Sequence, residues 1–178
     1  MHTFQLIKQD LLRYTQLMAS DCPRSAQIHS FWFLLFTPRY LPVLIYRLSH
    51  ALYRHRLFLP SKLLCSLNII LFGIEIAPAC PIGPGLVLPH TSGTVIGAAS
   101  IGANATIFQG STLGAKTLVF NYALSHRPKL GSEITVGAGS KILGNICVGD
   151  NVIIGANAVV LSDLPANCTA VGIPAKPL

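Results

Sequence analysis

A six-residue period runs through residues 130–160 and limits what this part of the chain can fold into. Every sixth residue is a branched aliphatic, namely Leu130, Val136, Ile142, Val148, Ile154 and Val160. A period of six fits neither an amphipathic helix nor an alternating strand. It is typical of a parallel β-helix, in which short strands wind as a coil and each stacks on its equivalent one turn away.

The same period occurs upstream, with two interruptions. It is kept by the aliphatic residues Ile76, Ile82, Leu88, Ile101, Ile107 and Leu113. The step from Ile96 to Ile101 is five residues, so one residue is missing there. The step from Leu113 to Leu130 is seventeen residues, which predicts an excursion loop at about residues 114–129. Long loops that leave a regular scaffold often carry function.

The residue three places after each repeat aliphatic predicts a tight corner. Seven of these nine residues are Gly or Asn, which accept a left-handed backbone, and the exceptions are Thr91 and Glu133. Matching corners favour the coil over the alternative, a β-sandwich. We therefore expect a mostly β fold, with a β-helix domain over 75–178 whose tail from residue 161 leaves the coil as an extended strap.

Residues 1–74 are predicted to form a separate, short helical domain. Residues 3–20 and 38–72 have the pattern of helices, with a very apolar segment at 31–36, and we expect Pro60 to end one helix and Ser61 to cap the next. This part holds eight Lys and Arg but two acidic residues. The basic excess indicates either a solvated face or an anionic partner, such as a membrane surface or a phosphate-bearing substrate. No nucleic-acid-binding motif occurs, so we expect no nucleic-acid partner.

The cysteines and the N-terminus indicate the compartment. Five Cys occur without a C-x-x-C pair, which predicts reduced thiols and a cytoplasmic protein. Lys8, Asp10 and Arg13 interrupt the first twenty residues, so no secretory signal is expected. The apolar helical segments are too short or too interrupted to span a bilayer. We expect these helices to pack on the coil or on a sister subunit, and peripheral contact with the inner face of a membrane is the alternative.

Two histidines are candidates for chemistry. His90 lies within the predicted coil and His126 within the excursion, and residues 75–178 contain no third His. A metal site with three His ligands is therefore not expected. A structural role at a corner is the alternative for His90.

Residues 73–178 resemble the serine acetyltransferase family of left-handed β-helix acyltransferases. The resemblance rests on GIEIAP at 73–78, IGPG at 82–85, HTSGTVIG at 90–97, QGSTLG at 109–114, VGAGSKILGN at 136–145 and VGIPAK at 171–176. It implies a left-handed coil, acetyl-CoA as co-substrate, no metal, and a homotrimer with each active site between neighbouring coils. YRLSH at 46–50 resembles the end of the family's N-terminal domain, which is much longer than the helical part here.

The resemblance also implies roles for single residues. His90 matches the general base that deprotonates an acceptor hydroxyl, and Glu75 matches the carboxylate that orients its imidazole. Their fifteen-residue spacing is close to one turn of a coil. Gly114, Ala115, Ala138 and Ala156 fall where the family keeps small residues along the acetyl-CoA groove, and Lys176 falls on a basic residue of its tail. His126 and Arg127 fall on the acceptor-binding positions.

Two departures from the family concern the acceptor. Pro89 stands where the family has an Asp that serves serine, and His126-Arg127 reverses the family's order. Pro89 predicts weak or no acetylation of free L-serine unless another carboxylate, such as Asp10 or Asp21, binds its ammonium group. We therefore expect an O-acetyltransferase whose acceptor is a sugar hydroxyl of a polysaccharide or its lipid-linked precursor, as in exopolysaccharide biosynthesis. The alternatives are serine O-acetyltransferase for cysteine biosynthesis and a catalytically silent scaffold.

Overall fold

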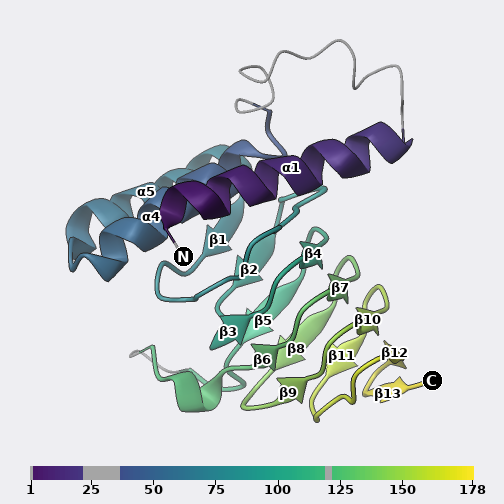
Figure 1. The fold of residues 1–178 in the computed structure, drawn as a ribbon. Coiled ribbons are helices and arrows are strands. Elements are labelled where there is room, and N and C mark those ends of the chain that lie inside the picture. Colours follow the sequence, from purple (N-terminus) through teal and green to yellow (C-terminus); the bar gives the residue numbers. More distant parts are fainter. Residues whose placement is uncertain (1, 22–36, 119–121) are drawn as a thin grey trace.

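The computed structural model describes residues 2–21, 37–118 and 122–178 (Figure 1). The helical part consists of α1 (Thr3–Asp21), α4 (Leu41–Arg54) and α5 (Phe58–Phe72). The predicted apolar segment at 31–36 and the side chain of Asp21 lie outside the described residues. Figure 1 shows the three helices at one end of a coil of strands, with the C-terminus at the other end.

The break between α4 and α5 falls earlier than expected. Pro60 does not end a helix: it is the third residue of α5, where its missing N–H would have no intrahelical partner in any case. The chain turns instead at Arg56, which has a left-handed backbone with φ 62°. Ser61 does not cap α5 either, because its hydroxyl donates to Ser49 O of α4 at 2.8 Å while Ser49 Oγ donates to Ser61 O at 2.8 Å. This buried pair joins the two helices as a hairpin.

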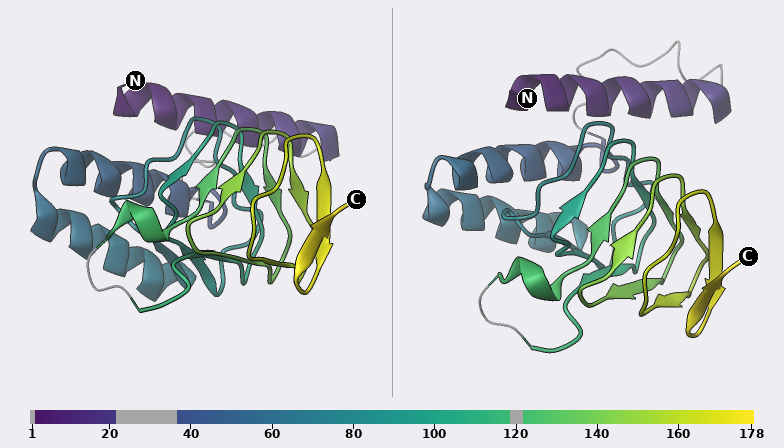
Figure 2. Two further views of the ribbon diagram at one scale, coloured as in Figure 1. Left: turned by 90° about the horizontal axis from the view of Figure 1, so that it is seen from below. Right: turned by 60° about the horizontal axis from the view of Figure 1, so that its bottom comes forward.

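The strands form a three-sided coil, as the period predicts, and the coil is left-handed, as the family resemblance implies (Figures 1 and 2). Sheet A contains β1 (Ile74–Ile76), β2 (Thr94–Ile96), β5 (Thr112–Gly114), β8 (Lys141–Leu143) and β11 (Val159–Val160). Sheet B contains β3 (Ser100–Ile101), β6 (Lys129–Leu130) and β9 (Cys147–Val148). Sheet C contains β4 (Thr106–Ile107), β7 (Thr135–Val136), β10 (Ile153–Ile154), β12 (Thr169–Gly172) and β13 (Ala175–Pro177).

The repeat aliphatics fill the interior of the coil, and the corners are largely as predicted. Ile107, Val136 and Ile142 are among the fully buried core residues. Left-handed backbone occurs at six of the seven predicted Gly and Asn corners, with Asn145 the exception. Glu133 also adopts φ 58°, although its residue type argued against it. Its side chain accepts a hydrogen bond from Asn104 Nδ2 at 2.5 Å, which fastens it to the corner one turn away.

The tail does not leave the coil at residue 161. Leu164 bridges to Val148, and β12 pairs in parallel with β10, so the coil continues for a further turn. β13 then returns antiparallel to β12 and closes the end of the coil. The prediction of an extended strap was wrong. Leu164 and Ala170 are buried in the interior of the coil, although the six-residue period is broken after Val160.

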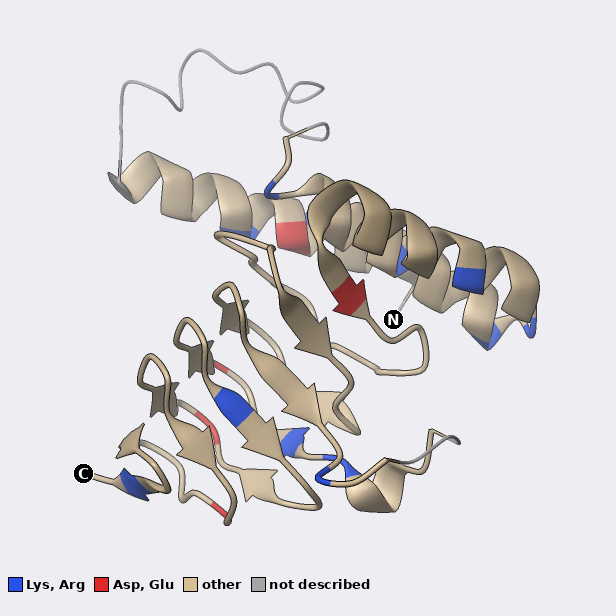
Figure 3. Ribbon diagram, turned by 180° about the vertical axis from the view of Figure 1, so that it is seen from behind, with Lys and Arg blue, Asp and Glu red and all other residues tan. Residues whose placement is uncertain are grey.

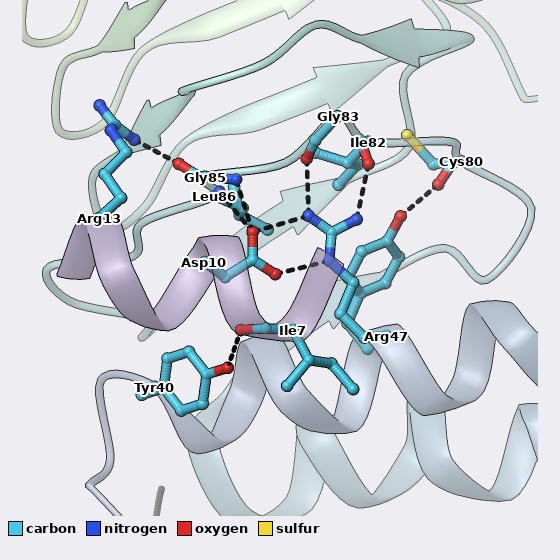
Figure 4. A network of polar contacts seen from close by, with 11 residues as sticks. Ile7, Asp10, Arg13, Tyr40, Arg47, Cys80, Ile82, Gly83, Gly85 and Leu86 are labelled. Carbon is cyan, nitrogen blue, oxygen red and sulfur yellow. Dashed lines mark hydrogen bonds and ion pairs between the residues drawn. The ribbon is translucent and has the colours of Figure 1, made fainter. Parts of the chain in front are cut away.

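A buried ion pair fastens the helices to the first turn of the coil (Figure 4). Asp10 of α1 accepts hydrogen bonds from Arg47 Nε at 2.7 Å and Arg47 Nη2 at 2.9 Å, and from the backbone N–H groups of Gly85 and Leu86. Arg47 of α4 also donates to Ile82 O and Gly83 O, each at 2.6 Å. Asp10 and Arg47 are 0% and 1% exposed. Asp10 is therefore a structural residue and cannot bind a substrate ammonium group.

Candidate active site

His90 lies at the corner of the coil between sheets C and A. Val87 bridges to Thr106 of β4 in sheet C, and β2 of sheet A begins four residues after His90. The next residue, Thr91, donates its hydroxyl to Phe72 O at 2.9 Å, and Gly93 N donates to Gly73 O at 2.9 Å. These bonds hold the segment under the junction of α5 and β1 and leave the His90 side chain exposed.

A groove of about 460 Å³ runs beside His90. Its lining comes from the corner and from the segment before α4, and consists of Pro38, Arg39, Pro89, His90, Thr91, Ser92 and Gln109. None of the described residues that line the groove is acidic, and Arg39 gives it a positive charge. The Oε1 atom of Gln109 is buried and has no hydrogen-bond partner among the described residues. A buried acceptor of this kind is a candidate partner for a substrate N–H or O–H group.

Glu75 lies on β1, one turn of the coil from the His90 segment. Its side chain points out of sheet A and is exposed. Burial raises the pKa of the Cys65 thiol, and the nearby Glu75 carboxylate raises that pKa further, which places this carboxylate beside α5. Among the described residues, no hydrogen bond or ion pair joins Glu75 to His90. The two side chains lie on adjacent turns, but the pairing expected from the family is not made in this structure.

Small residues continue the His90 corner down the coil. Gly110 N donates to Ser92 O at 3.0 Å, Gly139 N to Gln109 O at 2.9 Å and Asn157 N to Ala138 O at 2.8 Å. Ser92, Gln109 and Ala138 are therefore stacked at successive turns, and Ala156 follows one turn below. Ala138 and Ala156, two of the residues predicted to line an acetyl-CoA groove, thus lie at the same corner of the coil as His90.

The excursion loop leaves the coil at a different corner, between sheets A and B. It contains the short helix η1 (Leu124–His126), which is followed directly by Arg127. Arg127 Nη1 donates to Gly97 O at 2.7 Å, and its guanidinium carbon lies 3.9 Å from the centre of the Tyr122 ring. Tyr122 in turn donates its hydroxyl to Ala98 O at 2.7 Å. Arg127 is therefore held against the coil, whereas His126 is exposed.

Within one chain the predicted site residues lie at two different corners, with Lys176 apart from both. His90 precedes β2, whereas Arg127 bonds to Gly97, which directly follows β2. Gly114 and Ala115 lie at the excursion corner, and a Cβ added at Gly114 would meet no atom of the described residues within 4 Å. Lys176 is exposed on β13, at the far end of the coil. A single chain does not bring the base and the predicted acceptor-binding residues together.

Three contributors to these corners were not assigned from the sequence. Gln109 lies in the QGSTLG segment, and its buried oxygen, which has no partner among the described residues, is apparent only in the folded chain. Arg39 reaches the His90 groove from the helical part, and Tyr122 orients Arg127. The six-residue period does not include Arg39 or Tyr122. The sequence signals for them are a basic residue directly after Thr37-Pro38 and an aromatic residue within the excursion. Within the described residues, no group of three or more His, Cys, Asp or Glu could hold a metal ion.

Comparison with known proteins shows which family this chain resembles. The family model for the bacterial transferase hexapeptide, described as six repeats, matches residues 127–162. Serine acetyltransferase of Helicobacter pylori strain J99 is 48% identical over 144 residues, which cover 80% of this chain and 82% of that protein. The relatives carry this name, which favours the serine alternative over the polysaccharide acceptor expected from the sequence.

Solved structures agree with the sequence relatives. Neisseria gonorrhoeae serine acetyltransferase in complex with serine superposes with a TM-score of 0.81 at 31% identity, covering 99% of this chain and 69% of that chain. A serine acetyltransferase in complex with CoA superposes with a TM-score of 0.77 at 28% identity, covering 99% and 69%. The similarity therefore includes the helical part as well as the coil.

Proposed function

The chain belongs to the serine acetyltransferase family and is an acetyl-CoA-dependent O-acetyltransferase, and from this premise we propose that its acceptor is the hydroxyl group of L-serine. The observation that carries the choice of acceptor is the 48% identity to a serine acetyltransferase over 82% of that relative. The groove beside His90 adds a cation, Arg39, suited to a substrate carboxylate.

In this proposal His90 is the general base. Its imidazole nitrogen accepts the proton of the acceptor hydroxyl while the hydroxyl oxygen attacks the thioester carbonyl carbon of acetyl-CoA. The carbonyl electrons return as the carbon–sulfur bond breaks, and the imidazolium gives its proton to the departing CoA sulfur. The exposure of His90 beside the groove supports this role, since a base must reach the proton that it removes.

The active site is proposed to be shared between subunits of a homotrimer. His90 with Ala138 and Ala156 lies on one corner of the coil, and Arg127 with Gly114 and Ala115 lies on another. If coils pack side by side, the first corner of one subunit faces the second corner of its neighbour. Acetyl-CoA then lies between the two rows of small residues, with Lys176 available for a phosphate group.

The ammonium group of serine needs an acceptor in the groove. Among the described residues that line the groove there is no carboxylate: Pro89 occupies the position beside the base, and Asp10 is buried in its ion pair with Arg47. We assign the ammonium group to Gln109 Oε1, a neutral acceptor without another partner among the described residues. The same observation favours a second candidate acceptor, a saccharide hydroxyl, which needs no ammonium pocket.

Acetyl-CoA consumption by the full chain distinguishes the two acceptors. We expect turnover with millimolar L-serine, formation of O-acetylserine by mass spectrometry, and no turnover with saccharides. Pro89→Asp is expected to lower the KM for serine roughly 10- to 100-fold, since a hydrogen bond to a charged group contributes about 1.5–3 kcal/mol. Turnover on saccharides but not on serine, with no gain from Pro89→Asp, would reject serine as the acceptor.

Glu75 is proposed to position His90, and its charge is the property to test. We expect Glu75→Gln to lower kcat by less than the roughly 10²–10⁴-fold loss that follows removal of a general base. Glu75→Asp retains the carboxylate and is expected to restore most of the activity, which a purely structural role of the longer side chain would not predict. Wild-type kcat in Glu75→Gln would remove Glu75 from the mechanism.

A further inference from the structure

Tyr122 of the excursion loop is fixed to the coil. Its hydroxyl donates to Ala98 O at 2.7 Å, and its ring packs against the buried core of the coil. Burial raises the pKa of the Tyr122 phenol above its usual range, and the nearby Cys80 thiol raises that pKa further. The hydroxyl therefore stays protonated and serves as a hydrogen-bond donor, not as an acid or base in the reaction.

The Tyr122 ring carries the guanidinium group of Arg127. The guanidinium carbon lies 3.9 Å from the centre of the ring, and Arg127 Nη1 donates to Gly97 O at 2.7 Å. A Cβ atom added at Gly97 would lie 2.7 Å from Nη1, so this close approach requires the glycine. One face and one corner of the guanidinium group are thus held by the chain itself.

The charge of Arg127 and one of its donors have no partner in the described part of the chain. The Nε atom is buried and makes no hydrogen bond there, and Arg127 belongs to no ion pair there. The sequence contains no Asp or Glu from residue 76 to residue 132. Figure 3 shows positive charge, without negative charge beside it, where the excursion returns to the coil. Because buried polar groups are nearly always paired, the missing acceptor points to an anionic group of another molecule.

We propose that Tyr122 is a positioning residue that acts through Arg127 on the carboxylate group of the acceptor. This role rests on the proposed function, in which serine is the acceptor and the Arg127 corner of one subunit faces the His90 groove of its neighbour. Stacking on an aromatic ring fixes the plane of a guanidinium group, so less conformational entropy is lost when it binds a carboxylate. Arg127 then joins Arg39 of the neighbouring chain as a second cation beside the acceptor.

The reversed order of His126 and Arg127 determines which side chain the ring holds. His126 is exposed, and its Nδ1 atom pairs with the hydroxyl of the adjacent Ser125 at 3.1 Å, which does not tie the imidazole to the coil. In the order of the family the guanidinium group would stand at this exposed position. The aromatic ring at Tyr122 therefore has its cationic partner because the arginine comes second.

Steady-state kinetics and calorimetry of the full chain with L-serine test this role. Tyr122→Leu removes the ring and is expected to raise the KM and the Kd for serine roughly 3- to 30-fold, the range of a cation–π contact. We expect kcat and the KM for acetyl-CoA to stay within about twofold of wild type, because neither the base nor the donor groove is altered. Tyr122→Phe keeps the ring without the hydroxyl and is expected to restore most of the affinity for serine.

A double variant and a control from the same loop make the outcome decisive. Tyr122→Leu/Arg127→Ala is expected to bind serine no more weakly than Arg127→Ala, since the ring acts through the guanidinium group. Leu118→Ser changes an exposed residue of the excursion and is expected to keep wild-type kinetics.

The failure of this role differs from the failure of the proposed acceptor. Wild-type affinity for serine in Tyr122→Leu, equal losses in kcat and in the affinity for both substrates, or additive losses in the double variant overturn the role of Tyr122 and leave serine as the acceptor. Absence of serine turnover by the wild type rejects the acceptor and this role together.

Discussion

Replacing His90 by alanine is expected to abolish acetyl transfer while acetyl-CoA still binds. The imidazole acts on the acceptor hydroxyl, and its loss removes general-base assistance that is typically worth about 10²–10⁴-fold in rate. Its side chain is exposed at the corner, so truncation should leave the coil intact. The measurements are kcat with saturating acetyl-CoA and serine, and the affinity for CoA by calorimetry.

A second exposed histidine provides the control for this variant. His55→Ala changes the same residue type in the turn between α4 and α5 and is expected to keep wild-type turnover. Near-normal turnover in folded His90→Ala would exclude His90 as the base. Mixing His90→Ala subunits with Arg127→Ala subunits tests the shared site, since activity can return only where intact corners from two different chains meet.

Replacing Asp10 by alanine is expected to destabilise the protein by about 3–5 kcal/mol, because it leaves the Arg47 guanidinium buried without its counter-charge. The change also removes the acceptor of the Gly85 and Leu86 N–H groups. Urea unfolding of the full chain measures the effect. We expect α1 to lose much of its attachment, since among the described residues the remaining polar link between its side chains and the coil is Arg13, which donates to Gly85 O, Ala105 O and Thr106 Oγ1.

Two further variants separate the charge from the packing. Lys8→Ala removes an exposed charge from the same helix and is expected to change the free energy of unfolding by no more than about 0.5 kcal/mol. Asp10→Leu/Arg47→Met removes both charges and is expected to be less destabilised than Asp10→Ala, as buried ion pairs are often replaceable by apolar residues. An Asp10→Ala protein as stable as the wild type would contradict the structural role of the pair.

The sequence by itself determined the coil, because its rule is local. Each short strand places one branched aliphatic residue in the interior of the coil, and these residues recur every six positions. Gly or Asn three residues later adopts the left-handed backbone of the corner. The excursion was equally visible, since a step of seventeen residues cannot be accommodated within that period. The tail was misjudged where the period faded, although Leu164 and Ala170 still occupy core positions.

Only the tertiary structure decided which polar residues are free to act. Asp10 and Arg47 lie 37 positions apart in sequence, and nothing in their local pattern distinguishes a buried pair from two solvated charges. The same holds for Arg127, which is bound to Tyr122 and Gly97, and for Gln109, whose buried oxygen has no partner among the described residues. The fold also placed His90 and Arg127 at different corners, because three-sided winding separates the two ends of β2. Burial and charge pairing depend on contacts between residues that are distant in the sequence. The six-residue period places the strands, but it does not show which polar side chains meet.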